Sequence, residues 1–224
     1  MPVLRKPVAL VLFGSPGSGK GTQSKYIVEW LSIPQISTGD ILRDLVRKGD
    51  SAIGERLRAG HLVSDELVND LVGDRIGEED CKNGFILDGY PRTTAQADEM
   101  MRLLASVGAG EVVIHLVVDY NVIISRITGR RVCPVCGTLY NAISHPPKVD
   151  GKCDLEGVEL EVRDDDREEV VRERLEEYER QTQPLIEFFA KGGHRLYRVD
   201  ASTKAPDDVF REIQKDLIQE GLVG

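Results

Sequence analysis

The feature that most constrains this chain is the stretch from Gly14 to Thr22, which reads GSPGSGKGT. It follows an unbroken apolar run at residues 8–13, which is typical of a strand buried on both faces. Residues 23–31 can continue as a helix. A strand, a glycine-rich loop and a Gly-Lys pair at a helix start indicate a phosphate-binding P-loop, because the backbone N–H groups, the helix N-terminus and Lys20 all attract an anion. The alternative, a glycine-rich turn, leaves Lys20 without a role.

The position after Lys20 departs from the general P-loop pattern. It is Gly21, where the pattern has a Ser or Thr whose hydroxyl binds magnesium. The hydroxyl is therefore missing or displaced to Thr22. This departure suggests a P-loop that holds its metal indirectly, through water molecules and acidic residues.

The length and charge of the chain limit its function classes. Its 224 residues suffice for one sizeable core with insertions or for two small domains. The net charge of −9 argues against a nucleic-acid or anionic-membrane surface covering the molecule. A local arginine cluster could still bind an anion, since salt screens charges beyond about 8–10 Å. The first apolar run is too short for a signal peptide or a membrane span, which need about 7–15 and about 20 residues. We therefore expect a cytoplasmic protein and, without a sustained heptad seam, a monomer.

Buried-strand patterns recur along the chain and alternate with helical patterns. They lie at residues 33–36, 85–87, 111–118 and 195–199, and a long charged helix is expected at about 165–190. This alternation predicts an α/β, three-layer P-loop fold with about five parallel strands covered by helices on both faces.

Asp88 ends the apolar strand expected at residues 85–87. Ligands of open α/β sheets bind at the carboxyl ends of the strands. In a P-loop protein, an acidic residue at this place is a candidate for holding the hydration shell of magnesium. The alternative role is that of a turn residue at the strand end.

Three of the four cysteines cluster in a stretch that is rich in glycine and proline. The segments CPVC and CDLE repeat one spacing, and zinc accepts three thiolates and a carboxylate in a tetrahedral site. The predicted ligands of a structural Zn²⁺ are Cys133, Cys136, Cys153 and Glu156. His145 and Asp154 are alternative fourth ligands, and the cysteines could instead be reduced thiols in a small β insert. Cys81 lies far from them in sequence and is expected to be a small packed residue.

Over essentially its whole length, the chain resembles the adenylate kinase family in its long bacterial form with a zinc-type lid. The motifs that carry the resemblance are the P-loop, STGDILR at 37–43, DGYPR at 88–92, GRR at 129–131 and RDDD at 163–166. The resemblance implies reversible, magnesium-dependent phosphoryl transfer from ATP to AMP, giving two ADP. It also implies a core at 1–36, 66–128 and 167–224, a small helical AMP-binding (NMP) segment at 37–65 and a small β lid at 129–166.

The resemblance further implies roles for residues at matching positions. ATP would be bound by Gly17, Ser18, Gly19, Lys20, Gly21, Thr22, Arg126, Arg130, Leu139, Tyr140 and Lys204. AMP would be bound by Thr38, Arg43, Leu62, Val63, Gly89, Tyr90, Pro91, Arg92, Gln96, Arg163 and Arg174, with Gln96 at the adenine edge. The catalytic cations would be Lys20, Arg43, Arg92, Arg130, Arg163 and Arg174. Asp40 and Asp88 would orient magnesium through water, and Asp165 and Asp166 match positions that pair with lid arginines.

Two departures from the family pattern bear on these roles. The stretch at 54–60 is about one helical turn shorter, which affects the AMP contacts at Leu62 and Val63. Glu156 stands where the family usually has Cys or Asp, and its longer arm should still reach the metal.

Three other functions compete with this hypothesis. The first is another nucleoside monophosphate kinase, for UMP, CMP or GMP, or a kinase that phosphorylates AMP from GTP. The second is a hydrolysing P-loop switch or ATPase, which needs a water-positioning residue and switch loops that the sequence does not show. The third is a zinc-ribbon module for nucleic acid, which the acidic balance and the absence of interleaved aromatic and basic residues oppose.

Overall fold

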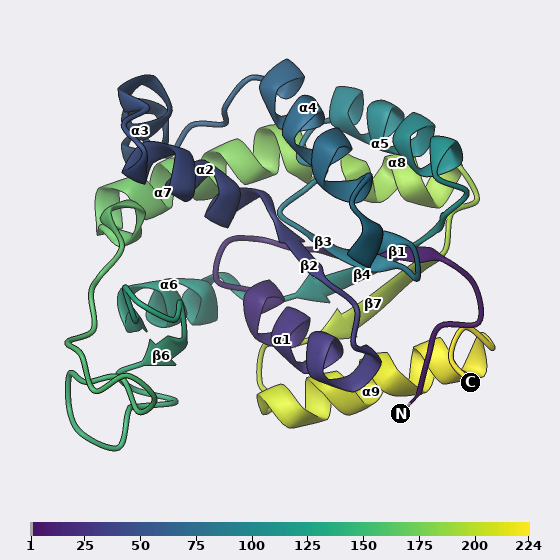
Figure 1. Ribbon diagram of the computed structural model, residues 1–224. Helices are drawn as coiled ribbons and strands as arrows, with labels where there is room; N and C mark the ends of the chain where they lie inside the picture. The colour runs from purple at the N-terminus through teal and green to yellow at the C-terminus, as the bar shows by residue number, and fades with distance from the viewer. Residues whose placement is uncertain (1) are drawn as a thin grey trace.

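The computed structural model describes residues 2–224, and its centre is a five-stranded parallel sheet (Figure 1). The strand order is β2-β3-β1-β4-β7. The strands are β1 (Val8–Phe13), β2 (Gln35–Ser37), β3 (Phe85–Asp88), β4 (Gly110–Val117) and β7 (Leu196–Asp200). The predicted three-layer α/β fold with five parallel strands is therefore confirmed.

The middle strand, β1, explains why both faces of the sheet are covered. Its six residues are all buried, and successive side chains enter opposite cores. Helices α1 (Lys20–Leu31) and α9 (Pro206–Gln219) cover one face, and α4 (Asp65–Ile76), α5 (Thr94–Ser106) and α8 (Leu185–Lys191) cover the other (Figure 1). Burial on both faces of the sheet thus explains why β1 is apolar throughout, with no alternation of apolar and polar residues.

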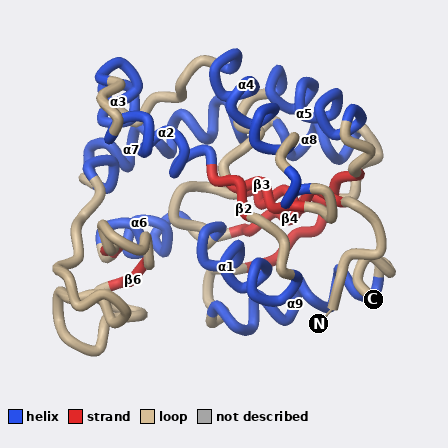
Figure 2. The backbone as a smooth tube through the Cα atoms, in the orientation of Figure 1, coloured by secondary structure: helices blue, strands red, loops and turns tan. Residues whose placement is uncertain are grey.

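Two parts of the chain project from the sheet on the side of the strand carboxyl ends (Figure 1). One is helical, with α2 (Thr38–Arg47) and α3 (Ser51–Arg58), whose first turns are capped by the side chains of Ser37 and Asp50. The other follows α6 (Tyr120–Thr128) and is mostly loop around the two-stranded sheet of β5 (Arg130–Val132) and β6 (Leu139–Asn141) (Figure 2).

Gly60 is where the helical projection meets α7 (Glu168–Glu177). Its φ of +79° is a left-handed conformation that favours glycine. A Cβ atom there would lie 3.1 Å from the carbonyl oxygen of Val170 and 3.2 Å from Cγ of Arg174. A side chain at this position would therefore push the loop after α3 away from α7.

The long charged helix expected at about 165–190 is interrupted. The chain instead forms the 3₁₀ turn η2 (Asp164–Asp166), then α7, the π-helical turn η3 (Tyr178–Thr182) and α8. Pro184 lacks a backbone N–H and cannot continue the helical hydrogen-bond series, which explains the break before α8. The short 3₁₀ helix η1 (Glu79–Cys81) precedes β3 and contains the buried Cys81, as predicted for a packed thiol.

Among the helices of residues 2–224, none is both long enough and apolar enough to cross a membrane.

His115 on β4 is a buried imidazole behind the P-loop strand. It is 7% exposed, packs edge-on against Phe13, and its Nδ1 atom has no hydrogen-bond partner within the described part of the chain. Burial, and then the charges of Arg198 and Lys20, lower its pKa from 6.5 to about 4. The folded state therefore favours the neutral form of the His115 ring.

This burial predicts an acid-sensitive step in stability. Because the pKa is depressed on folding, the contribution of His115 is complete above pH 6.5 and is lost as the pH falls towards 4, by at most about 1.4 kcal/mol per pH unit. Urea unfolding of the wild type and of His115→Gln at pH 7.5 and pH 5 measures this loss. We expect the variant to lose less free energy of unfolding on acidification, and equal losses would contradict the argument.

Candidate active site

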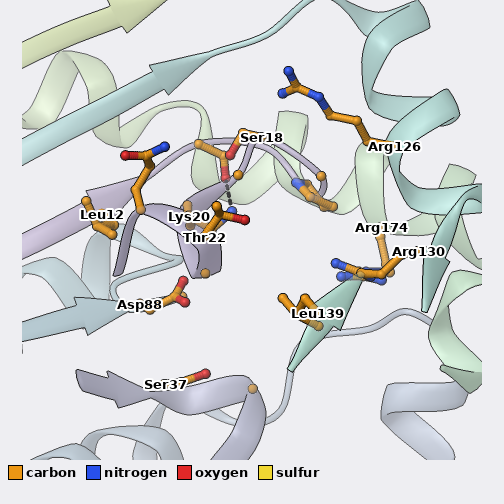
Figure 3. Close-up of a pocket in the computed structure, with 18 of the residues that line it drawn as sticks. Leu12, Ser18, Lys20, Thr22, Ser37, Asp88, Arg126, Arg130, Leu139 and Arg174 are labelled. Atoms are coloured by element: carbon orange, nitrogen blue, oxygen red, sulfur yellow. Dashed lines mark hydrogen bonds between the residues drawn. The ribbon is translucent and has the colours of Figure 1, made fainter. Parts of the chain in front are cut away.

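A single cavity of about 1080 Å³ opens at the carboxyl ends of the strands, between the sheet and the two projections. The P-loop, α2, the loop after β3, the β5–β6 region and α7 all contribute to its walls. In Figure 3, Lys20 and Thr22 lie opposite Arg130 and Arg174, with Asp88 and Leu139 along the side. Segments far apart in sequence therefore share one space.

The P-loop holds its lysine in a fixed position. Lys20 is the first residue of α1, and its Nζ donates hydrogen bonds to the carbonyl oxygens of Gly14 at 2.8 Å and Ser15 at 2.9 Å (Figure 3). Gly17 has a φ of +77°, and a Cβ atom there would lie only 2.8 Å from Cγ1 of Ile127 on α6. The loop therefore needs glycine at this point to curl against α6.

Nearly all the residues predicted to bind nucleotide line this cavity. They are Gly17, Ser18, Gly19, Lys20, Gly21, Thr22, Thr38, Asp40, Arg43, Leu62, Val63, Asp88, Gly89, Pro91, Arg92, Gln96, Arg126, Arg130, Leu139, Tyr140, Arg163, Arg174 and Lys204. Tyr90 is not among the lining residues, because its ring is 1% exposed in the core and its hydroxyl donates to Asn69 Oδ1 at 2.8 Å. The four predicted zinc ligands lie elsewhere, in the β5–β6 region.

The cavity concentrates positive charge that is poorly hydrated. The pKa of Lys20 is lowered to about 8, chiefly by burial and then by Arg92, Arg174 and Arg130. The pKa values of Arg92 and Arg163 are each lowered to about 10, chiefly by burial and then by neighbouring arginines. An anion entering the cavity would relieve this repulsion, so the site favours polyanionic ligands.

Asp166 orders two of the arginines. Its carboxylate is fully buried and accepts from Arg130 Nε at 2.7 Å, from Arg130 Nη2 and from Arg174 Nη1 at 3.2 Å. Asp165 adds a second partner for Arg174, with Oδ2 at 2.9 Å from Nη1. Burial lowers the pKa of Arg130, but the hydrogen bond and charge of Asp166 outweigh it and raise the pKa. Strand β5 and helix α7 are thereby joined through one carboxylate.

Arg92 is fixed by three hydrogen bonds, which use its backbone and its Nε but not Nη1 or Nη2. Its backbone N–H donates to Gln96 Oε1 at 2.7 Å, and its Nε donates to the carbonyl of Gly89 at 2.8 Å. Its own carbonyl oxygen accepts from the hydroxyl of Thr182 at 2.9 Å. Thr182 belongs to the π-helical turn η3 and was not predicted from the sequence.

The two predicted magnesium carboxylates line the cavity from different elements, Asp88 from the end of β3 and Asp40 from the first turn of α2. Asp88 at the end of β3 accepts from Gln35 Nε2 at 3.0 Å, and its pKa is raised by burial, with Lys20 opposing the shift. Asp40 accepts from Arg43 Nη2 at 2.6 Å. Burial raises its pKa, but the charge and hydrogen bond of Arg43 outweigh burial and lower it. Oxygen donors at this place suit a hard cation such as Mg²⁺.

Three cysteine sulfurs converge in the β5–β6 region. Those of Cys133, Cys136 and Cys153 all lie within 4.8 Å of one another. Burial raises the pKa of Cys153, but hydrogen bonds from the Tyr140 hydroxyl and from backbone N–H groups outweigh it and lower the pKa to about 6. Converging sulfurs with one favoured thiolate fit a soft metal ion.

The fourth predicted zinc ligand is less well placed. Within residues 2–224, Glu156, Asp154 and His145 do not belong to the 4.8 Å group, and Glu156 is exposed on the loop after Cys153. Asp154 Oδ1 accepts instead from the backbone N–H of Lys148 at 2.8 Å, and His145 lines the large cavity. The fourth position of the cluster therefore stays a prediction.

Several further cavity residues had no sequence signal. Glu177, Tyr178 and Thr182 come from the end of α7 and the π-helical turn, and Ile143 comes from the loop after β6. They lie within an expected continuous helix and a segment without periodicity, so no pattern distinguished them. The break at Pro184 was the one available clue to the turn.

Comparison with known proteins agrees with this geometry. A family model described as adenylate kinase matches residues 12–194. Curated adenylate kinases from Thermosipho africanus, Listeria monocytogenes and Caldanaerobacter subterraneus are 46%, 45% and 47% identical to this chain. These alignments cover 91%, 93% and 93% of the chain and 96%, 98% and 96% of the respective relatives. With a P-loop and a ring of arginines in one cavity and these matches along most of its length, the chain belongs to the adenylate kinase family.

Proposed function

We propose that this protein catalyses the reversible transfer of the terminal phosphoryl group of ATP to AMP, giving two ADP. The observation that carries this proposal is that the P-loop lysine and six arginines from separate segments line one cavity. A nucleotide hydrolase does not require so many cations on the side opposite the P-loop. Membership of the adenylate kinase family supports the same reaction.

The two nucleotides would enter from opposite sides of the cavity. Residues 17–22, with Lys20, would cradle the phosphates of ATP, because backbone N–H groups at a helix N-terminus bind anions. Arg126, Leu139, Tyr140 and Lys204 would adjoin the rest of ATP. The AMP side would comprise Thr38, Arg43, Leu62, Val63, Gly89, Tyr90, Pro91, Arg92 and Gln96, together with Arg163 and Arg174. Tyr90, buried in the core, would act there through its backbone.

Transfer between two anions depends on charge neutralisation and alignment more than on proton transfer. Arg92, Arg130 and Arg174 supply permanent charge and a planar fork that grips phosphate oxygens. No general base is assigned. Mg²⁺ bound with ATP supplies further neutralisation of the phosphates, and Asp40 and Asp88 would hold its hydration shell.

Closure of the site is the second part of the proposal. The segments 37–65 and 129–166 would close over a core of 1–36, 66–128 and 167–224, of which Met1 lies outside the described residues. A Cβ atom at Gly21 would lie 3.6 Å from Cδ1 of Leu139, which supports a lid strand that covers the P-loop. Such closure excludes water, the competing acceptor of the phosphoryl group.

The direct test follows ADP formation from ATP and Mg²⁺ with and without AMP. We expect the rate of ADP formation to depend on AMP. Consumption of ATP at the same rate with and without AMP would overturn the assignment. A panel of GTP as donor and UMP, CMP and GMP as acceptors separates the related kinases. We expect ATP and AMP to give the highest kcat/KM.

We further propose that the cysteine cluster binds a structural Zn²⁺ that holds the lid together. The lid is too small for a core of its own, because its buried cluster contains only Cys133, Tyr140 and Cys153. Glu156 would complete the site by a movement of its exposed loop.

Removal of the metal tests this proposal. Metal analysis should find one zinc ion per chain, and chelation should lower Tm by at least about 5 °C, since structural zinc contributes folding free energy. Adding Zn²⁺ should restore Tm. Cys136→Ser should lose the ion, and Glu156→Gln should retain it more weakly. An unchanged Tm after complete chelation would contradict a structural zinc.

A monomer in the cytoplasm that acts on free nucleotides, without nucleic acid or membrane partners, completes the proposal. The acidic net charge of −9 supports it.

A further inference from the structure

The side-chain amide of Gln96 is held between two groups of opposite polarity. Gln96 lies in the first turn of α5, is 2% exposed and lines the large cavity. Its Oε1 accepts from the backbone N–H of Arg92 at 2.7 Å. Its Nε2 donates to Oδ1 of Asp65 at 2.7 Å. Each end of the amide therefore already has one partner within the protein.

Asp65 is itself anchored between two helices. It is the first residue of α4, and its Oδ2 accepts from the hydroxyl of Thr93 at 2.8 Å. The same hydroxyl accepts from the backbone N–H of Gln96 at 3.1 Å and so caps α5. The carboxylate thus spans α4 and α5 and cannot follow a rotation of the Gln96 amide.

These partners permit only one orientation of the amide. A carboxylate only accepts hydrogen bonds and a backbone N–H only donates them. Rotation of the Gln96 amide by half a turn would put its oxygen against the Asp65 carboxylate and its NH₂ against the Arg92 N–H. Both contacts would be repulsive, in a buried place where an unsatisfied polar group is costly.

The locked amide offers the cavity one N–H donor beside one oxygen acceptor. The adenine edge presents a 6-amino donor and an N1 acceptor, which is the complementary pattern. Hypoxanthine presents a 6-oxo acceptor and an N1–H donor, which is the reverse pattern. We propose that Asp65 is a positioning residue for acceptor specificity, which locks Gln96 so that the site takes 6-aminopurine nucleotides and rejects 6-oxopurine nucleotides. This inference rests on the proposed transfer to AMP.

The wild-type protein provides the first test, with ATP, Mg²⁺ and three acceptors. AMP makes both hydrogen bonds, purine riboside 5′-monophosphate keeps only the N1 acceptor, and IMP opposes both groups. We expect kcat/KM to fall in that order, with IMP at least tenfold below purine riboside 5′-monophosphate. An amide that rotates freely would accept IMP better than the purine analogue, and that result would overturn the inference.

Asp65→Asn provides the second test, because an Asn amide either accepts or donates and so tolerates both orientations of Gln96. Its matched control is Glu66→Gln, which removes the same charge from the same first turn at an exposed side chain. We expect the AMP-to-IMP ratio of kcat/KM to fall at least tenfold in Asp65→Asn and to stay within twofold of wild type in the control.

The outcomes of these tests separate the two hypotheses. A folded Asp65→Asn protein that loses activity on AMP and IMP equally assigns Asp65 a structural role only and overturns the inference. If this variant does not fold, the order of acceptors in the wild type decides. A wild type that forms no ADP from AMP overturns the proposed function and this inference with it. ADP formation from AMP with the wrong order of acceptors overturns the inference alone.

Discussion

Replacing Lys20 by Met is expected to lower kcat at least about a thousandfold, because the transferred group loses the one cation that the P-loop itself supplies. The fold should survive this change. Burial lowers the pKa of Lys20 to about 8, so its charge is a cost to the folded state that the neutral side chain removes. We expect the free energy of unfolding at pH 7 to stay equal or to rise, by on the order of 1–3 kcal/mol.

The pH dependence of the free energy of unfolding tests this prediction without an activity measurement. Because the pKa of Lys20 is depressed on folding, the cost of its charge is fully present below pH 8 and disappears as the pH rises through 10.5. The stability advantage of Lys20→Met should shrink over the same range, as measured by urea unfolding. Lys215→Met, an exposed change on α9, serves as the control and should leave kcat within twofold. A Lys20→Met protein with near-normal kcat would contradict the role of the P-loop cation.

Replacing Arg130 by Lys should lower kcat by about a hundredfold to a thousandfold, with a much smaller change in Tm. The guanidinium gives Nε and one terminal nitrogen to Asp166, which leaves Nη1 for a phosphate in the cavity. A lysine has one nitrogen, and the buried carboxylate of Asp166 would hold it. The ion pair that stabilises the fold would persist while the contact with the phosphate is lost.

Arg131→Lys is the matched control for this change. Arg131 is the next residue on β5, and its Nη1 donates to the backbone carbonyl oxygens of Thr128 and Arg130, outside the set of residues that line the cavity. We expect its kcat at saturating ATP and AMP to stay within about threefold of wild type. A similar loss in both variants would assign the effect to the folding of the β5–β6 region rather than to a contact with phosphate.

The parts of this fold that could be predicted are those whose cause is local. A continuous apolar run predicted β1 because both faces of that strand are buried. Asp88 could be predicted to line the site because it ends a buried strand, where the loops of a parallel sheet gather. The glycines and Lys20 of the P-loop are adjacent in sequence, so the geometry that they build is visible in a single motif.

The parts that could not be predicted arise from contacts between distant segments. The two hydrogen bonds that fix the Gln96 amide include one that its Nε2 donates to Asp65 on another helix. Thr182 reaches Arg92 because a π-helical turn interrupts an otherwise regular charged segment. The position of Glu156 depends on the path of a loop that has no periodicity. Helical or strand patterns contain none of this information.

The π-helical turn at Tyr178–Thr182 also bears on how related chains should be aligned. A turn closed by i→i+5 hydrogen bonds accommodates about one residue more than an α-helical turn. A homologue that lacks the turn would therefore show a one-residue gap within this stretch, while the helical faces before and after it keep their phase. Because Thr182 ends this turn, such a gap would change the segment whose hydroxyl donates to the carbonyl oxygen of Arg92.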